Sequence, residues 1–187
     1  MGRILERYGT ALAGLALIVF FAAAAPNFLN PANLLSIGKE TSFLAILALG
    51  FMLALIAGEL DLSIADVASL AAVACGALVQ WGYGPLAGVA AALGVGLAAG
   101  LFNGFAVTIL HVPSLIATLG LAAIAKGLGF MLTQGVAFVG RWPTEFTGLA
   151  RGALLGVPNL ILWLIAVSAL VWLLVGATRT GLHMTAA

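Results

Sequence analysis

The chain is short of charge, and this shortage bounds the kinds of protein it can be. Only 7% of its 187 residues are charged and 64% are hydrophobic, whereas soluble domains are about 25% charged and about half apolar. So few polar groups cannot cover the surface of a soluble fold. Disorder requires low hydrophobicity. The composition therefore excludes both a free cytosolic enzyme and a disordered chain.

Residues that carry chemistry are also scarce. The chain has one cysteine, Cys75, and two widely separated histidines, His111 and His183. This set excludes an intramolecular disulfide and a cysteine-based metal site, and the sequence contains no metal, phosphate or nucleophile motif. The net charge of +1 comes without the basic patch that nucleic acid binding needs. We expect no catalytic centre, no metal, no cofactor and no nucleic acid partner.

Long apolar runs are abundant instead, and the mean hydropathy is +1.23. A helix needs about 20 apolar residues to cross a hydrocarbon core about 30 Å thick. Membrane β-barrels show alternating polarity, which these runs lack. The sequence therefore predicts an all-α, polytopic membrane protein that forms a single transmembrane domain over residues 1–187. Six spans are expected, at Tyr8–Ala25, Thr41–Ala57, Ser63–Val79, Pro85–Leu110, Ser114–Thr133 and Pro158–Ala177.

The second and third spans are short, so either could be a broken or partly spanning helix. Proline suits a first helical turn, which favours a short interfacial helix within Pro26–Glu40; a plain connector is the alternative. Gln134–Val157 is expected to be the main external loop. The first run is longer than a signal-peptide core and more spans follow, so we expect a retained helix. Basic loop residues divide evenly, three on each side of the membrane, so their count does not set the orientation. Because the N-terminal arginines Arg3 and Arg7 usually dominate, we expect a cytoplasmic N-terminus.

Charged side chains occur in two places where a bilayer would make them costly. A charge at the bilayer centre costs about 2.5–3.5 kcal/mol on insertion scales, so it normally faces a cavity or a partner. The first place is the segment from Gly58 to Asp66. Within it, Ser63 and Asp66 have the S-x-x-D spacing that predicts a helix cap. Glu59 and Asp61 lie either in a solvated turn or at a helix break at membrane depth that lines a polar path.

The second place is Lys126, about midway in the fifth span. Its ammonium could snorkel to the interface, pair with Asp61 or Glu59, or contribute to a water-filled path. Thr118 precedes it in the same span. The Thr118 hydroxyl can return to the carbonyl four residues earlier, or it can line the same path.

The fourth span carries small residues at intervals of four. Small residues on one helix face let two backbones approach closely in lipid, so we expect this row to pack against another helix. Asn103 lies beside the row, and its amide is expected to bond a neighbouring helix, with a solute as the alternative partner. The row consists of Gly88, Ala92, Gly96, Gly100 and Gly104.

Several stretches follow the order of a known family. Ala57–Ser63 looks like a G-G/E-x-D-L-S signature, and Leu101–Phe105 with His111–Gly120 is similar to an N-G…V-P-x-x-I-x-T-L-G stretch. Ala125–Leu128 stands where that family has an R-G-L-like sequence. Together these segments resemble the permease subunit of bacterial ABC sugar importers of the ribose, xylose and galactose type. Gly156–Asn159 and Thr178–Gly181 also follow the family order.

The resemblance implies a translocation subunit of the bacterial inner membrane that works by alternating access. Its implied partners are a second permease copy or homologue, cytoplasmic ATP-binding subunits, an extracytoplasmic solute-binding protein and membrane lipid. ATP is bound by those partners and not by this chain. The candidate residues for the path of a sugar or similar small polar solute are Glu59, Asp61, Ser63, Asn103, Thr118 and Lys126.

The chain departs from the family pattern in two places. Ala65-Asp66 stands where the family commonly has Gly-Ser, and the sequence stops at Ala187, where the family continues into its ATPase-docking segment. We therefore expect the chain to correspond to the N-terminal part of such a permease. Two other classes stay open: a truncated, non-transporting membrane scaffold, and an ion-coupled carrier that uses Asp61 and Lys126.

Overall fold

The computed structural model describes residues 2–139, 142–178, 181 and 184, and for residues 2–7 it describes the backbone only. His183, part of Thr178–Gly181 and the side chains of Arg3 and Arg7 thus lie outside the described residues. The chain divides into two compact units, Met1–Thr41 and Ser42–Ala187.

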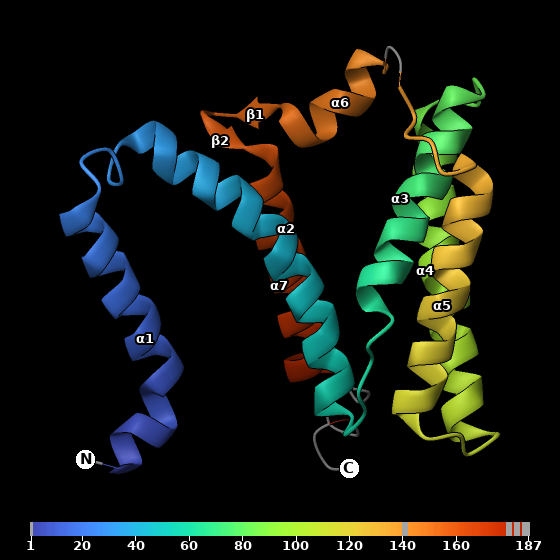
Figure 1. Ribbon diagram of the computed structural model, residues 1–187, viewed down its shortest axis with the longest axis horizontal. Coiled ribbons are helices and arrows are strands. Elements are labelled where there is room, and N and C mark those ends of the chain that lie inside the picture. Colours follow the sequence, from blue (N-terminus) through green and yellow to red (C-terminus); the bar gives the residue numbers. More distant parts are fainter. Residues whose placement is uncertain (1, 140–141, 179–180, 182–183, 185–187) are drawn as a thin grey trace. The chain divides into compact units, whose positions relative to one another are not determined.

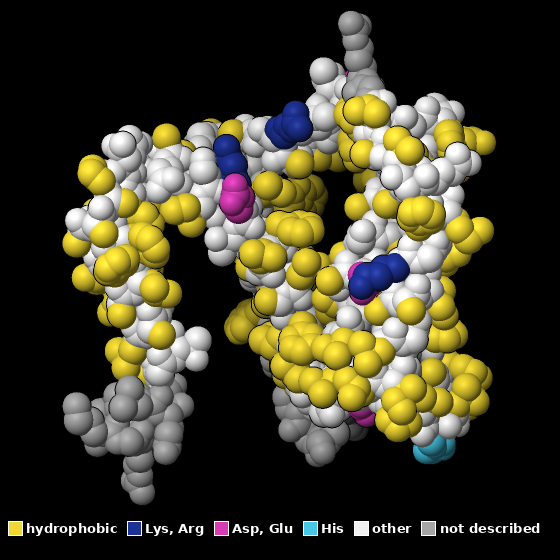
Figure 2. All heavy atoms as spheres, viewed as in Figure 1, with side chains coloured by type: hydrophobic (Ala, Val, Ile, Leu, Met, Phe, Trp, Pro, Cys, Tyr) yellow, Lys and Arg dark blue, Asp and Glu magenta, His cyan; other side chains and the backbone are white. Residues whose placement is uncertain are grey.

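The described residues are mostly helical (Figure 1), which confirms the predicted all-α, polytopic fold. Four helices, α2, α4, α5 and α7, are long and apolar enough to cross a membrane. Charged side chains rarely interrupt the uncharged and hydrophobic surface of the helices (Figure 2). The elements are α1 (Gly2–Ala24), α2 (Pro31–Ile56), α3 (Ile64–Gln80), α4 (Pro85–Thr108), α5 (Ser114–Thr133), α6 (Thr144–Arg151), β1 (Ala153–Leu154), β2 (Val157–Pro158) and α7 (Asn159–Ala177).

Helix α2 corrects two expectations. It starts at Pro31 and continues without interruption to Ile56, so the interfacial helix expected within Pro26–Glu40 is the beginning of the second span. The Asn30 side chain caps the helix by accepting from the Ala32 N–H at 3.0 Å. No proline follows Pro31 within α2, and nothing else in its sequence breaks the helix. Of the six expected spans, the apolar stretch of α1 (Tyr8–Ala24) and α3 are the shorter ones.

The segment expected to be the main external loop, Gln134–Val157, contains structure of its own. It holds α6 and one strand of a hairpin in which Ala153 pairs with Pro158. The Trp163 indole N–H donates to the Leu149 carbonyl at 3.0 Å, and the Asn159 amide donates to the Gly148 carbonyl at 2.8 Å. These two bonds attach α6 to the first turns of α7.

Helices α3, α4 and α5 pack together and hold most of the buried residues (Figure 1). Most of the buried apolar side chains there are small, so the helix backbones lie close together, as is typical of helices in lipid. They include Cys75 and Ala77 of α3, Ala106 of α4, and Ala117, Ala122 and Ala125 of α5.

Only one end of the small-residue row on α4 packs as expected. A Cβ at Gly88 would lie 2.8 Å from a Val79 methyl and 2.9 Å from the Cys75 carbonyl oxygen, whereas at Gly96, Gly100 and Gly104 it would meet nothing within 4 Å. The reason is geometric. Residues four apart advance by 400°, so each step turns the row by about 40°, and four steps turn it by roughly 160°. The row therefore winds around the helix instead of staying on one face.

This difference predicts opposite effects for the same substitution at two glycines of α4. Gly88→Ala forces a Cβ against α3 and should lower the free energy of unfolding by about 1–3 kcal/mol through overpacking. Gly96→Ala meets open space and should be neutral or stabilising by up to ~1 kcal/mol through helix propensity. Unfolding of the two variants in detergent micelles by SDS titration measures both. Equal effects would contradict the packing at Gly88.

Candidate solute path

The break between α2 and α3 is built by the backbone around Gly58. Gly58 has a φ of +78°, a conformation that suits glycine at the end of a helix. Its N–H donates to the Leu55 carbonyl at 3.0 Å, and the Glu59 N–H donates to the Ala54 carbonyl at 3.0 Å. This pair of bonds is the Schellman motif, which ends α2 sharply. Residues 57–63 are not part of a helix.

Side chains of α5 take over the backbone bonds that the break leaves open. The Leu60 N–H donates to the Ser114 hydroxyl at 3.4 Å, and the Thr118 hydroxyl donates to the Leu60 carbonyl at 3.3 Å. Thr118 is only 2% exposed. Its predicted return to its own helix falls on the Leu115 carbonyl, three residues earlier, at 3.5 Å. These two bonds satisfy both backbone groups of Leu60 without a helix.

Asp61 and Ser63 form the next part of the break. The Asp61 carboxylate accepts from the Ser63 N–H at 2.8 Å and from the Ser63 hydroxyl at 2.5 Å. The expected capping box of Ser63 and Asp66 is therefore wrong: Ser63 makes no side-chain bond to the first turn of α3, and its N–H, which the box assigns to Asp66, donates to Asp61. Instead, the side chain of Asp61, which precedes the turn, accepts the hydrogen bonds that stabilise it.

Asn103 of α4 joins this arrangement from the neighbouring helix. Its Nδ2 donates to the Ser63 hydroxyl oxygen at 3.1 Å, which is the interhelical alternative expected for this amide. An ionised carboxylate only accepts, so Asp61 directs the Ser63 proton and leaves that oxygen to accept from Asn103. The Asn103 Oδ1 is buried and has no partner among the described residues. A partly satisfied buried network of this kind is sensitive to any change in its members.

Glu59 does not join the network. It is exposed in the turn that ends α2. Asp61 is half-buried and is bonded to Ser63 as described. The two acids, which the sequence pattern assigns to the same role, therefore have different surroundings in the structure.

Lys126 pairs with an acid that the sequence analysis assigned to a cap. Its ammonium lies 3.4 Å from Asp66 Oδ1, and the two side chains are 71% and 21% exposed. The predicted pairing of Lys126 with Asp61 or Glu59 is therefore wrong, and the positions of the acids explain why. Asp61 is bonded to Ser63 in the break, whereas Asp66 lies in the first turn of α3, a helix that packs against α5.

The sequence did not indicate the hollows between the helices, which include a groove and a bowl. A groove of about 280 Å³ between α3, α4 and α5 is apolar, and a bowl of about 380 Å³ lies between α6 and α7. No short motif marks either, although the bowl is rich in aromatic residues. In the described part of the chain, no group of three or more His, Cys, Asp or Glu could hold a metal. The groove is lined by Val67, Leu70, Phe102, Leu121 and Leu128 among others, and the bowl by Trp142, Phe146, Arg151 and Trp163 among others.

Comparison with known proteins places the chain among membrane permeases. Residues 33–187 match the family described as branched-chain amino acid transport system / permease component, and the chain belongs to this family. The "Autoinducer 2 import system permease protein LsrC" of Yersinia pseudotuberculosis serotype O:3 (strain YPIII) is 33% identical over 180 residues, covering 94% of this chain and 50% of the relative. The protein of the same name from Yersinia pestis (strain Pestoides F) is 34% identical over the same shares.

These matches confirm the predicted likeness to an importer permease. The chain spans about half the length of the curated relatives it matches. No solved structure shows a significant match to the chain.

The network at the break predicts that Ser63 and Asn103 are energetically coupled. Ser63→Ala and Asn103→Ala should each lower the free energy of unfolding by about 1–3 kcal/mol, because each leaves a buried polar partner unpaired. The double variant should cost less than the sum of the two, by roughly 0.5–3 kcal/mol. SDS titration in micelles measures all three. Ser69→Ala is the matched control, since that serine is exposed on α3; strictly additive effects would refute the network.

Proposed function

We propose that this chain is the membrane permease subunit of an ATP-driven importer that carries a sugar or similar small hydroxylated solute across the bacterial inner membrane. Its family membership and the import-system permeases among its relatives support this proposal. The single observation that carries it is the helix break at residues 57–63, whose polar groups are held by side chains of α4 and α5.

The break supplies what a weak solute site needs. Asp61 and Ser63 bring a carboxylate and a hydroxyl into an apolar helix cluster, and such groups exchange hydrogen bonds readily with the hydroxyls of a solute. Bonds from α4 and α5 keep these groups in place without a continuous helix. A conduit benefits from weak sites, since a solute that binds tightly leaves slowly.

The transport cycle is alternating access, in which the chain makes and breaks no covalent bond. Its partners in the proposal are a second permease copy or homologue, cytoplasmic subunits that bind ATP, an extracytoplasmic solute-binding protein and the surrounding lipid. The N-terminus lies in the cytoplasm. An ion-coupled carrier that uses Asp61 and Lys126 together gains no support, because Lys126 pairs with Asp66.

The proposed function is tested by co-purification and uptake. The permease, tagged and extracted from its native membrane in mild detergent, should bring down an ATP-binding subunit and a solute-binding protein. Membrane vesicles containing that complex should accumulate D-ribose or autoinducer 2 only when ATP is supplied. Solute-driven proton flux without ATP would instead favour the carrier. If neither uptake nor co-purifying partners are found, the non-transporting scaffold is the remaining alternative.

Asp61 provides the sharpest residue-level prediction for this function. In the transporting complex, Asp61→Ala should lower the initial uptake rate by at least about tenfold, a change of ~1.4 kcal/mol, because Ser63 loses its acceptor. Membrane insertion should stay normal. Glu59→Ala is the control, since Glu59 is exposed in the adjoining turn, and it should retain uptake. Unchanged uptake in Asp61→Ala would remove Asp61 from the path.

A further inference from the structure

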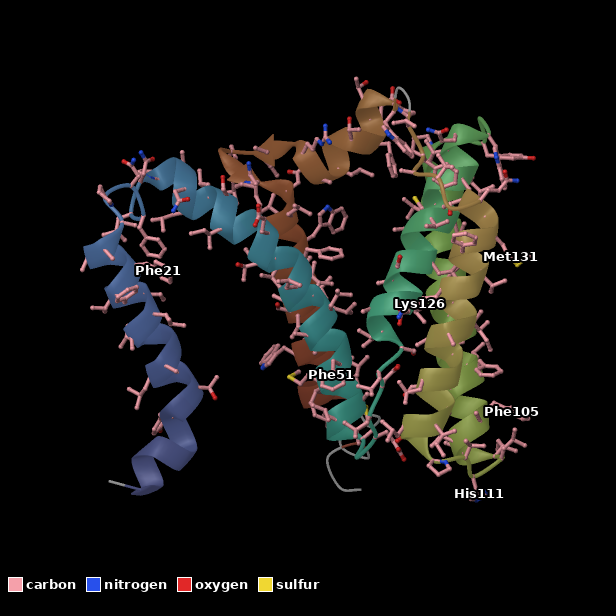
Figure 3. The ribbon with its side chains drawn as sticks, viewed as in Figure 1. Phe21, Phe51, Phe105, His111, Lys126 and Met131 are labelled. Atoms are coloured by element: carbon pink, nitrogen blue, oxygen red, sulfur yellow. The ribbon has the colours of Figure 1, made fainter. Side chains whose placement is uncertain are left out.

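Helices α3 and α5 share an exposed face that carries charge deep within a span. Lys126 stands about three turns after the start of α5 and about two turns before its end. Its ammonium is turned to Asp66 of α3 rather than to either end of the helix (Figure 3). Snorkelling therefore does not describe this lysine, because the ion pair holds its charge beside the first turn of α3.

Hydrocarbon is a poor environment for this pair. The 3.4 Å separation is longer than the roughly 2.7–2.9 Å of a charge-assisted hydrogen bond. The described residues provide the ammonium with no second partner, and its side chain is mostly exposed. Two ammonium donors and part of the carboxylate thus need an acceptor and a donor that lipid tails lack. Water supplies both.

Polarity continues along the same face of α3. Ser69 follows Asp66 by three residues and therefore lies on the same side of the helix, and it is exposed. Helix α4 provides the contrast. Its exposed row of Leu93, Leu97 and Leu101 is wholly apolar, as expected of a surface in contact with lipid.

We infer that Asp66, Ser69 and Lys126 line a water-filled path through the membrane along α3 and α5. This inference rests on the proposed function, which supplies a solute that needs such a path. The ammonium donates, the carboxylate accepts and the hydroxyl does both, so the face suits an uncharged, hydroxylated solute. The loose ion pair leaves these groups free to exchange partners as the solute passes.

Thiol labelling in membranes tests the path directly. Cys75 is the sole cysteine, so Cys75→Ala gives a background for single-cysteine variants. Ser69→Cys preserves the ion pair and changes little volume, and Leu97→Cys is the control, at mid-length of α4 and similarly exposed. The reagent is a charged, membrane-impermeant methanethiosulfonate, applied to the full chain in sealed and in opened membrane vesicles.

A thiol reacts as its thiolate, which forms in water and not in hydrocarbon. Ser69→Cys should therefore react at least about tenfold faster than Leu97→Cys. Labelling after SDS denaturation should be complete at both positions, which shows that each thiol is intact. If Ser69→Cys reacts as slowly as Leu97→Cys before denaturation, lipid or another helix covers the face and the inference is overturned.

The labelling outcome is separable from that of the proposed function. If Ser69→Cys is labelled rapidly but co-purification and uptake fail, the water-exposed face is supported and the proposed solute transport is refuted. If labelling is slow but uptake depends on ATP, the importer function is supported and the solute path must lie on another face. Each result decides one of the two statements without depending on the other.

Discussion

A backbone or charged group within the membrane needs a hydrogen-bonding partner from the protein or from water, since lipid tails offer none. At the break at residues 57–63, the protein itself supplies such partners. Leaving the helix exposes carbonyls and N–H groups, and Ser114 and Thr118 of α5 bond those of Leu60. Asp61 satisfies Ser63, and Asn103 reaches the same hydroxyl from α4. The close packing of α3 with α4 and α5 is thus a condition for the break to exist.

Small residues make that packing possible. The α3–α4 contact at Gly88 leaves no room for a side chain, and the buried apolar residues of this helix group are mostly alanine. In lipid, association depends on such close approach and on interhelical hydrogen bonds, because apolar burial gives no advantage over the surrounding tails. The Ser63–Asn103 bond and the Gly88 contact lie toward opposite ends of α4, so they hold α3 against α4 along its length.

The helical class and most helix positions could be predicted from long apolar runs, whereas the acids near Gly58 indicated either a solvated turn or a helix break. What the sequence could not provide is the direction of each polar side chain. Ser63 and Asp66 have the spacing of a cap, yet both bond other residues: Ser63 bonds Asp61, two residues earlier, and Asp66 pairs with Lys126 of α5. A local pattern cannot show that α5 will bring a lysine beside α3. The uninterrupted α2 was missed because a proline at Pro31 suits the start of a long helix as well as a short one.

The winding of the α4 glycines has a further consequence for assembly. Gly88 and Gly104 face directions that differ by roughly 160°. A straight helix that packs closely against one of them therefore cannot also pack against the other. Helix α3 occupies the first position, so any close neighbour at the second must approach from the opposite side. Helix α4 can therefore separate two close neighbours, with α3 against one side at Gly88 and a second helix against the opposite side at Gly104.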